Sequence, residues 1–162
     1  MNKYFSYFKY VVEHKKNVFI ECFKRGLYIH AFTHDLSKFR PSEFIPYAKF
    51  FYSNNRTKKY ENNVNKTKDK KFFKDGFSLH QKRNKHHNTF WTVIVDGKIE
   101  TIEMPERYLK QMVCDFAGMS RKFGGSPREH YIKNRGNITL HPISREKFEK
   151  MLGVSDAELQ SV

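Results

Sequence analysis

The N-terminal part of the chain has its apolar side chains at the spacing of an amphipathic α-helix. Between residues 4 and 25 they recur with the helical period of about 3.6 residues, at Tyr4, Phe8, Val11, Val12, Val18, Phe19, Cys22 and Phe23. Gly26 follows Lys24 and Arg25, and a glycine after a basic last turn ends a helix because it tolerates positive φ. The pattern therefore predicts a first helix over about 4–25.

Two further helices and a long polar loop are predicted next. A second helix runs over about 27–39, because Pro41 forbids its continuation. Ser42, a favoured N-cap residue, opens a third helix over about 42–52. Residues 54–71 are rich in Asn and Lys and carry almost no apolar side chain, which predicts a long, mobile, basic surface loop.

The middle of the chain predicts one β-hairpin after another helix. Helical spacing returns over about 72–83. The run 90–95 is aromatic and β-branched, as strands are, and a second extended run follows over 98–103. Asp96-Gly97 between these runs suits a two-residue hairpin turn.

The last third of the chain begins with a strong helical pattern. Pro105 opens this helix and the Gly124-Gly125 pair ends it. Its buried stripe consists of Leu109, Met112, Val113 and Phe116. A shorter helix is predicted over 144–152 with Ser144 as its N-cap, and a final turn or helix follows Ser155.

Together these segments predict a mainly α fold, a helical bundle with one small β-hairpin. The chain has 162 residues, the usual size of one domain. We therefore predict a single domain over 1–162, in which 126–162 is a C-terminal extension packed on the rest. The 16 Phe and 9 Tyr suffice to fill a core, because each buried ring removes roughly 150–250 Å² from water.

The net charge and the cysteine content limit the classes of binding partner and the cellular compartment that we expect. The 31 Lys and Arg against 17 Asp and Glu give a net charge of +14, which raises the local concentration of anions. This favours a phosphate-bearing partner, a nucleotide or a nucleic acid, over the simpler alternative of a solvated basic surface. Cys22 and Cys114 lie among apolar residues and make no disulfide framework. With no signal-like apolar N-terminus and no membrane-length apolar run, we expect a cytoplasmic protein without a membrane partner.

Ligand-type side chains lie on two predicted apolar helical faces. His14 has apolar residues at offsets −7, −3 and +4, and Asp115 has them at the matching offsets on its own helix. A carboxylate in an apolar stripe is costly unless a cation or a donor pairs with it. One hydrogen bond to His14 and one salt bridge to Asp115 would explain each residue separately. With the adjacent pair His34 and Asp35 between them, one divalent metal explains all four, and such ligands suit zinc, manganese, iron, cobalt or nickel.

A second group of histidines lies between these positions, at His80, His86 and His87. A basic surface turn is one interpretation of this segment. The functional interpretations are ligands for a second metal ion, or acid and electrostatic groups that face a phosphate. The number of metal ions, one or two, therefore stays open.

The order H…HD…D on successive helices resembles the HD superfamily of metal-dependent phosphohydrolases. The strings HKKNV, HDLSKF, EFIPY, HxxxxxHH, MPxxY and DFxxMSRxF resemble more closely an uncharacterised bacterial and phage family with that signature, over about residues 4–131. The resemblance implies that His14, His34, Asp35 and Asp115 are metal ligands. In that chemistry the metal lowers the pKa of a bound water and orients it for attack on phosphorus.

The same resemblance implies further roles. Asp35 would hold the attacking water, and some HD proteins carry two metals with extra histidines where His80, His86 and His87 lie. His86 and His87 are therefore also candidate catalytic residues. Lys38 is a further candidate because it lies one helical turn after His34.

Three basic residues are candidates for binding the substrate phosphate: Lys38, Arg83 and Arg121. Lys38 follows His34 by one helical turn, and Arg121 shares a helix with Asp115. Arg is suited to forked contact with phosphate oxygens and Lys acts as a point charge. A solvated surface charge is the alternative for each. Glu43 is either a water-orienting carboxylate or a charge at a helix N-terminus.

The function that these observations favour is a cytoplasmic, divalent-metal-dependent phosphohydrolase acting on a small phosphoester, with a nucleotide as the favoured substrate. The alternative is a basic nucleic-acid-binding module with a structural or vestigial metal site. A second alternative is a di-iron HD-type oxygenase. The sequence does not decide the native metal, the bond that is cut or the oligomeric state.

Overall fold

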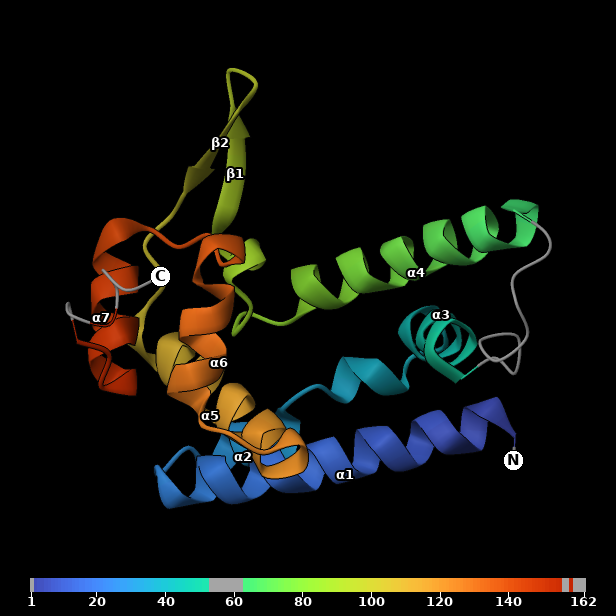
Figure 1. Ribbon diagram of the computed structural model, residues 1–162, viewed down its shortest axis with the longest axis horizontal. Helices are drawn as coiled ribbons and strands as arrows, with labels where there is room; N and C mark the ends of the chain where they lie inside the picture. The colour runs from blue at the N-terminus through green and yellow to red at the C-terminus, as the bar shows by residue number, and fades with distance from the viewer. Residues whose placement is uncertain (1, 53–62, 156–157, 159–162) are drawn as a thin grey trace. The chain divides into compact units, whose positions relative to one another are not determined.

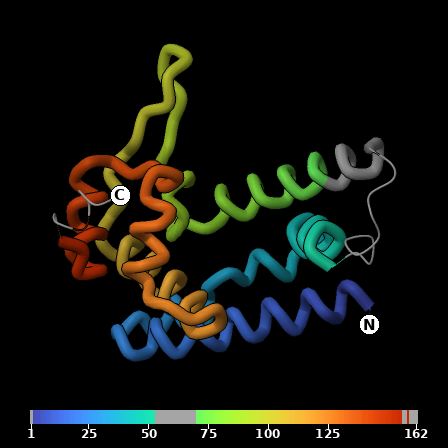
Figure 2. Tube along the Cα trace, viewed as in Figure 1, coloured from blue at the N-terminus to red at the C-terminus, as the bar shows by residue number. Residues whose placement is uncertain are grey.

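A computed structural model describes residues 2–52, 63–155 and 158 of the chain (Figure 1). It divides into two compact units, each built from two stretches of sequence. Unit 1 comprises residues 1–13 and 35–84, and unit 2 comprises residues 14–34 and 85–162. The chain passes from one unit to the other between Glu13 and His14, between His34 and Asp35 and between Asn84 and Lys85, a path that Figure 2 traces by colour. One continuous helix, Lys3–Lys24, belongs to both units, so the division into units does not by itself make two domains. The single domain predicted over 1–162 stays a prediction.

Most of the secondary-structure elements are helices. Their order is α1 (Lys3–Lys24), α2 (Tyr28–Thr33), the 3₁₀ turn η1 (Leu36–Phe39), α3 (Pro41–Tyr52), α4 (Asn63–Arg83), η3 (Asn88–Trp91), β1 (Thr92–Val95), β2 (Lys98–Thr101), α5 (Glu106–Phe123), α6 (Pro127–Asn134), η4 (Arg135–Asn137) and α7 (Pro142–Leu152). The predicted mainly α fold with one small hairpin is confirmed. Within the described ranges, no helix is both long enough and apolar enough to cross a membrane.

Unit 1 packs α3 against α4 and the first turns of α1. Its core contains Tyr7, Val11, Tyr47 and Ala48, surrounded by further aromatic rings. Phe50 of α3 stacks on Phe73 of α4 with ring centroids 4.1 Å apart. A Cβ at Gly76 would lie only 2.8 Å from the Cβ of Pro46, so the two helices approach closely where a side chain is missing.

Unit 2 packs α5 against α1, α2, α6 and α7. One core cluster consists of Met104, Leu109, Met112, Val113, Tyr131, Leu140 and Phe148. A second cluster joins α1, α2 and α5 and consists of Val18, Cys22, Ala31 and Cys114. A Cβ at Gly118 of α5 would lie 2.5 Å from Val18 Cγ2 and 3.0 Å from the Val18 backbone nitrogen. Helices α1 and α5 are therefore in near-backbone contact at this point.

The β-hairpin of unit 2 forms as predicted. Val95 pairs with Lys98 across the turn, and Asp96 and Gly97 have φ of 49° and 75°. Positive φ at both turn residues matches the right-handed twist of the flanking strands. Figure 1 shows this hairpin projecting away from α5, α6 and α7.

The structure differs from the predicted elements at four places. The predicted helix over 27–39 is broken: α2 ends at Thr33, and Asp35 adopts a left-handed backbone with φ of 54° before η1. The prediction of a loop is wrong for residues 63–71, because α4 already begins at Asn63. Lysine has a good helix propensity, so a polar run can extend a helix that is anchored further on. The remainder of that loop, residues 54–62, lies outside the described residues.

The other two corrections concern the C-terminal region. Helix α6 was not predicted, although Ser126 and Glu129 form a capping box with Pro127 at the first helical position. Helix α7 begins at Pro142 with His141 as its N-cap, not at Ser144. The Ser144 hydroxyl instead accepts the Met104 N–H at 2.8 Å inside the core. The turn predicted after Ser155 lies mostly outside the described residues.

The close contact at Gly118 makes a stability prediction. The substitution Gly118→Ala places a methyl group against the α1 backbone, and such overpacking costs about 1–3 kcal/mol. This outweighs the roughly 1 kcal/mol by which alanine favours a helix over glycine. We expect the urea midpoint of unfolding to fall. For Gly136→Ala, where an added Cβ meets nothing within 4 Å, the midpoint should not fall; equal effects of both substitutions would contradict the assigned contact.

Candidate metal centre

Four elements of unit 2 bring histidines and one aspartate to the same place. His14 lies on α1, His34 follows the last residue of α2, His86 precedes η3 and Asp115 lies on α5. His14, His34 and His86 are each at most 3% exposed. The predicted apolar faces of α1 and α5 therefore do place polar side chains in the interior of unit 2.

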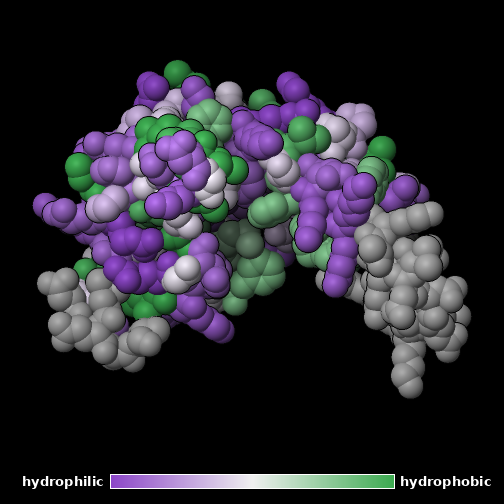
Figure 3. Space-filling model, turned by 90° about the horizontal axis from the view of Figure 1, so that it is seen from above, coloured by the Kyte–Doolittle hydropathy of each residue, from purple (hydrophilic) through white to green (hydrophobic). Residues whose placement is uncertain are grey.

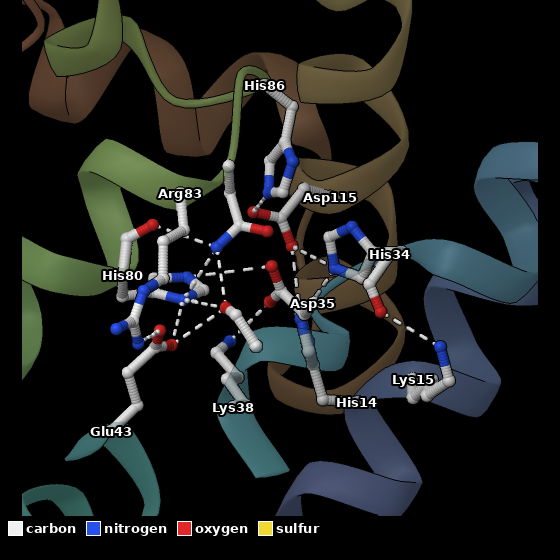
Figure 4. Close-up of polar contacts among 12 residues, drawn as sticks. His14, Lys15, His34, Asp35, Lys38, Glu43, His80, Arg83, His86 and Asp115 are labelled. Carbon is white, nitrogen blue, oxygen red and sulfur yellow. Dashed lines mark hydrogen bonds and ion pairs between the residues drawn. The ribbon is translucent and has the colours of Figure 1, made fainter. Parts of the chain in front are cut away.

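The closest atoms of this cluster form a compact triangle (Figure 4). His14 Nε2 lies 3.1 Å from His34 Nε2. The same Asp115 oxygen, Oδ1, lies 3.2 Å from His14 Nε2 and 3.6 Å from His34 Nε2. Ligands about 2.0–2.2 Å from a tetrahedral ion are separated from one another by about 3.3–3.6 Å. The three atoms therefore have the mutual spacing of ligands that share one metal ion.

Two further histidines border the triangle. His86 Nε2 lies 3.9 Å from the second carboxylate oxygen of Asp115. His30 Nε2 lies 3.3 Å from His34 Nδ1, the ring nitrogen of His34 that faces away from His14. One nitrogen from each of His30, His34 and His86 lies within 4.8 Å of the others. With Asp115, the four imidazoles make five ligand groups, one more than a closed tetrahedral site uses.

The position of His34 depends on how α2 ends. The Lys15 ammonium donates hydrogen bonds to the carbonyl oxygens of Phe32, at 2.6 Å, and His34, at 2.9 Å. A cation at a helix C-terminus satisfies carbonyls that lack helical partners and interacts favourably with the helix dipole. Because Lys15 follows His14 on α1, the same turn of α1 places one candidate ligand and fixes the backbone of another.

The donor set fits a divalent transition metal. Imidazole nitrogen and carboxylate oxygen suit zinc, manganese, iron, cobalt and nickel. His34 also has the arrangement usual for a ligating histidine, with its second nitrogen directed at another polar group, here His30. A buried cluster of histidines and aspartate that is suited to hold a metal ion is therefore a property of unit 2.

Unit 1 contains a separate polar network around Glu43, which is fully buried on α3. Glu43 Oε2 lies 3.0 Å from His80 Nδ1, and Oε1 accepts a hydrogen bond from Arg83 at 2.7 Å. Ser37 Oγ donates to Oε2 at 2.8 Å. Burial raises the pKa of the Glu43 carboxyl, but the hydrogen bonds from His80, Arg83 and Ser37 outweigh it and keep the pKa below its ordinary value.

The predicted site residues are therefore distributed over both units. His14, His34, His86 and Asp115 converge in unit 2. His87 adjoins His86, with ring centroids 4.2 Å apart. Asp35 and His80 belong to unit 1, where His80 Nε2 lies 3.5 Å from Asp35 Oδ1. The metal-ligand role predicted for Asp35, His80 and His87 stays a prediction.

Each predicted phosphate-binding cation contacts a carboxylate. Lys38 Nζ lies 2.6 Å from Asp35 Oδ2 in unit 1, and Arg83 contacts Glu43 as described. In unit 2, Arg121 Nη1 lies 3.0 Å from Glu21 Oε1. A phosphate would have to compete with these carboxylates, so none of the three cations is a preformed phosphate site by itself.

Two residues of the centre, His30 and Lys15, are not among the predicted site residues. His30 was overlooked, although it lies four residues before His34, and residues at that spacing share one face of a helix. Lys15 was not predicted to belong to the centre either. Its role depends on the carbonyls at the end of α2, which no local sequence pattern marks.

Comparison with known proteins identifies a family but no activity. The chain belongs to a family of unknown function (DUF5662), whose sequence model matches residues 3–154. No curated protein and no solved structure matches the chain. The matched range includes every candidate ligand, and the functional argument therefore depends on the geometry of the centre.

The Arg121 contact makes a pH-dependent prediction. Burial raises the pKa of the Glu21 carboxyl, but hydrogen bonds and charges from Arg25, Lys24 and Arg121 outweigh it, so the pKa is lowered from its ordinary 4.5. A carboxyl with a lowered pKa stabilises the fold above about pH 4.5, and this contribution is lost as the pH falls through the folded-state pKa. Glu21→Gln should lower the free energy of unfolding by about 1–2 kcal/mol at pH 7, since its arginine partners are partly exposed.

Urea unfolding of both proteins between pH 7 and pH 3 measures this effect. The difference between parent and Glu21→Gln should shrink as the pH falls below 4.5. The control is Glu146→Gln, which changes an exposed glutamate of α7 in the same way. A Glu21→Gln difference that is the same at all pH values would contradict the ionic role of this carboxylate.

Proposed function

We propose that the protein is a divalent-metal-dependent phosphohydrolase that acts on a small phosphoester, with nucleotides as the substrate class to test first. His14, His34 and Asp115 would hold the metal, and the remaining coordination position would stay open for water and substrate. The observation that carries this proposal is the buried triangle of two imidazole nitrogens and one carboxylate oxygen, 3.1–3.6 Å apart.

A metal ion accounts for this triangle better than hydrogen bonds alone. Of two imidazole nitrogens 3.1 Å apart, one must donate and the other must accept, so at least one lone pair is directed at its neighbour. That lone pair also lies near a carboxylate oxygen in a buried environment, where like charges are poorly screened. A dication among the three atoms turns this repulsion into attraction.

The composition of the centre supports a reactive site more than a structural one. Structural zinc sites are usually closed by four Cys and His ligands, whereas catalytic sites use three protein ligands and leave one position open. The triangle supplies three ligands without a thiolate. When bound, a divalent ion would lower the pKa of a water molecule and neutralise charge on phosphoryl oxygens.

The residues around the triangle have definable roles in such a reaction. His86, next to Asp115, is placed to give or take a proton as a neutral or protonated imidazole. The second nitrogen of His34 faces His30, which would fix the ring orientation. The net charge of +14 raises the concentration of anionic substrates near the protein. The catalytic roles predicted for Asp35, Lys38 and His87 are part of the same proposal.

The first prediction of this proposal concerns metal content. Purified parent protein should carry about one or two equivalents of a divalent transition metal, measured by inductively coupled plasma mass spectrometry after growth or supplementation with zinc, manganese, iron, cobalt or nickel. His34→Ala and Asp115→Ala should each lower metal affinity by at least tenfold and abolish phosphate release from a nucleotide panel. His130→Ala, which removes an exposed histidine of α6, should change neither quantity.

The outcomes separate binding from catalysis. If His34→Ala and Asp115→Ala proteins that remain folded by circular dichroism bound as much metal as the parent, the proposed ligands would be wrong. If the parent bound metal but released phosphate from no phosphoester with any of these metals, the metal centre would stand and the hydrolase would not.

The two alternative functions have their own readouts in the same samples. The net charge of +14 supports nucleic-acid binding, which would appear as salt-dependent retention of DNA or RNA that persists in His34→Ala. A di-iron oxygenase would contain iron, show a charge-transfer absorption band and consume oxygen. Phosphate release that depends on metal without oxygen consumption would favour the hydrolase over both.

A further inference from the structure

The β-hairpin of unit 2 exposes an apolar pair of side chains. On the hairpin two isoleucines are strongly exposed, Ile94 at 77% and Ile99 at 70%. Figure 3 shows apolar groups, in green, at the surface of the molecule among hydrophilic ones. Ile94 and Ile99 are directly opposite each other on β1 and β2 and therefore lie on the same face. A two-stranded hairpin is only marginally stable in water by itself. This face and the open strand edges are thus suited to contact another strand.

The alternation of hydrogen-bonded and non-hydrogen-bonded residue pairs along the hairpin determines which backbone groups of β2 point away from β1. The Ile102 N–H donates to the Trp91 carbonyl oxygen at 2.8 Å, so residues 91 and 102 form a hydrogen-bonded pair. Such pairs alternate along an antiparallel ladder. Val93 with Glu100 are then also hydrogen-bonded, whereas Ile94 with Ile99 are not. The backbone N–H and C=O of Ile99 consequently point away from β1, toward the open edge of the sheet.

We propose that two copies of this chain pair through β2, antiparallel and about a two-fold axis at Ile99. In this arrangement Ile99 and Ile99 of the partner subunit exchange the N–H and C=O groups that face the edge. The two hairpins become one four-stranded sheet. On one face, Ile94 and Ile99 continue into the same residues of the partner subunit and form an unbroken apolar row.

The charges of β2 favour this register over centring the axis at either neighbouring residue. Lys98 and Glu100 flank Ile99 and share the opposite face of the strand. Pairing centred at Ile99 places Lys98 opposite Glu100 of the partner subunit, twice in each dimer. Centring the axis at Lys98 would oppose two lysines, and centring it at Glu100 would oppose two glutamates. Opposite charges stabilise cross-strand pairs and like charges destabilise them, so only the Ile99 register is favourable.

The other edge of the hairpin lacks this selection. β1 reads Thr-Val-Ile-Val and has no charge that would distinguish one register from the next. Register is weakly specified in such strands. The occupant that the charge pattern fits is therefore a second β2 strand, and this proposal does not depend on the metal centre.

Charge reversal tests the proposed register. Sedimentation velocity of the full chain over a range of concentrations should show a species of twice the 19.5 kDa chain mass. Glu100→Lys and Lys98→Glu each replace two attractive pairs by repulsive ones and should weaken dimerisation roughly tenfold. The double variant Lys98→Glu, Glu100→Lys restores opposite charges and should restore the dimer. Added salt should weaken the parent dimer, because exposed charge pairs are screened.

A matched pair of isoleucine variants tests which edge is used. Ile99→Lys places two like charges at the two-fold axis and should abolish the dimer. Ile94→Lys makes the same change on the same face, one strand away from the axis, and should leave a dimer. Thermal unfolding monitored by circular dichroism checks that both variants fold. A parent that is monomeric at all concentrations, a double variant that fails to restore dimerisation, or dissociation by Ile94→Lys but not Ile99→Lys would each overturn the proposal.

Discussion

The left-handed backbone at Asp35 is the constraint on which the arrangement of the polar residues depends. A non-glycine residue rarely adopts positive φ, although aspartate tolerates it better than most. His34, with ψ of 125°, already leaves the helical path of α2, and the positive φ of Asp35 then leads the chain into η1, so that two neighbouring residues belong to different units. His34 joins the imidazole cluster of unit 2, while Asp35 pairs with Lys38 and His80 in unit 1. A continuous helix through these residues, as first predicted, would not divide them in this way.

The elements that could be predicted from the sequence are those whose residues interact mainly with near neighbours in the chain. The apolar periods of α1 and α5 and the Asp96-Gly97 turn are readable because each residue's role depends on near neighbours. The break in α2 was not readable, because its end is capped by Lys15 from another helix. The capping box at Ser126 was readable and was overlooked. The start of α4 was predicted too late, because the polar composition of residues 63–71 suggests a loop although lysine has a good helix propensity.

The same division applies to the candidate site. His14 and Asp115 could be selected because ligand-type side chains in apolar stripes require a partner, whereas His34 was selected from the adjacent His-Asp pair and His86 from the histidine-rich segment. What could not be predicted is which of the remaining charges are already engaged. Lys38 and Arg121 looked like phosphate ligands from their helical spacing, but each contacts a carboxylate that lies in another turn or another helix. Net charge therefore describes how the protein attracts anions and not where one would bind.

The near-contact of α1 and α5 has a consequence for the metal centre. Val18 lies one helical turn after His14, and Gly118 lies about one turn after Asp115, so each ligand shares a helix face with one side of that contact. The absence of a methyl group at residue 118 thereby sets how closely the two ligands can approach. Ionic radius and helix packing are linked through this spacing: a wider separation would suit a larger ion, and a tightly bound small ion would pull the helices together. Residue 118, which is not one of the proposed ligands, would therefore influence which ion the proposed site accepts.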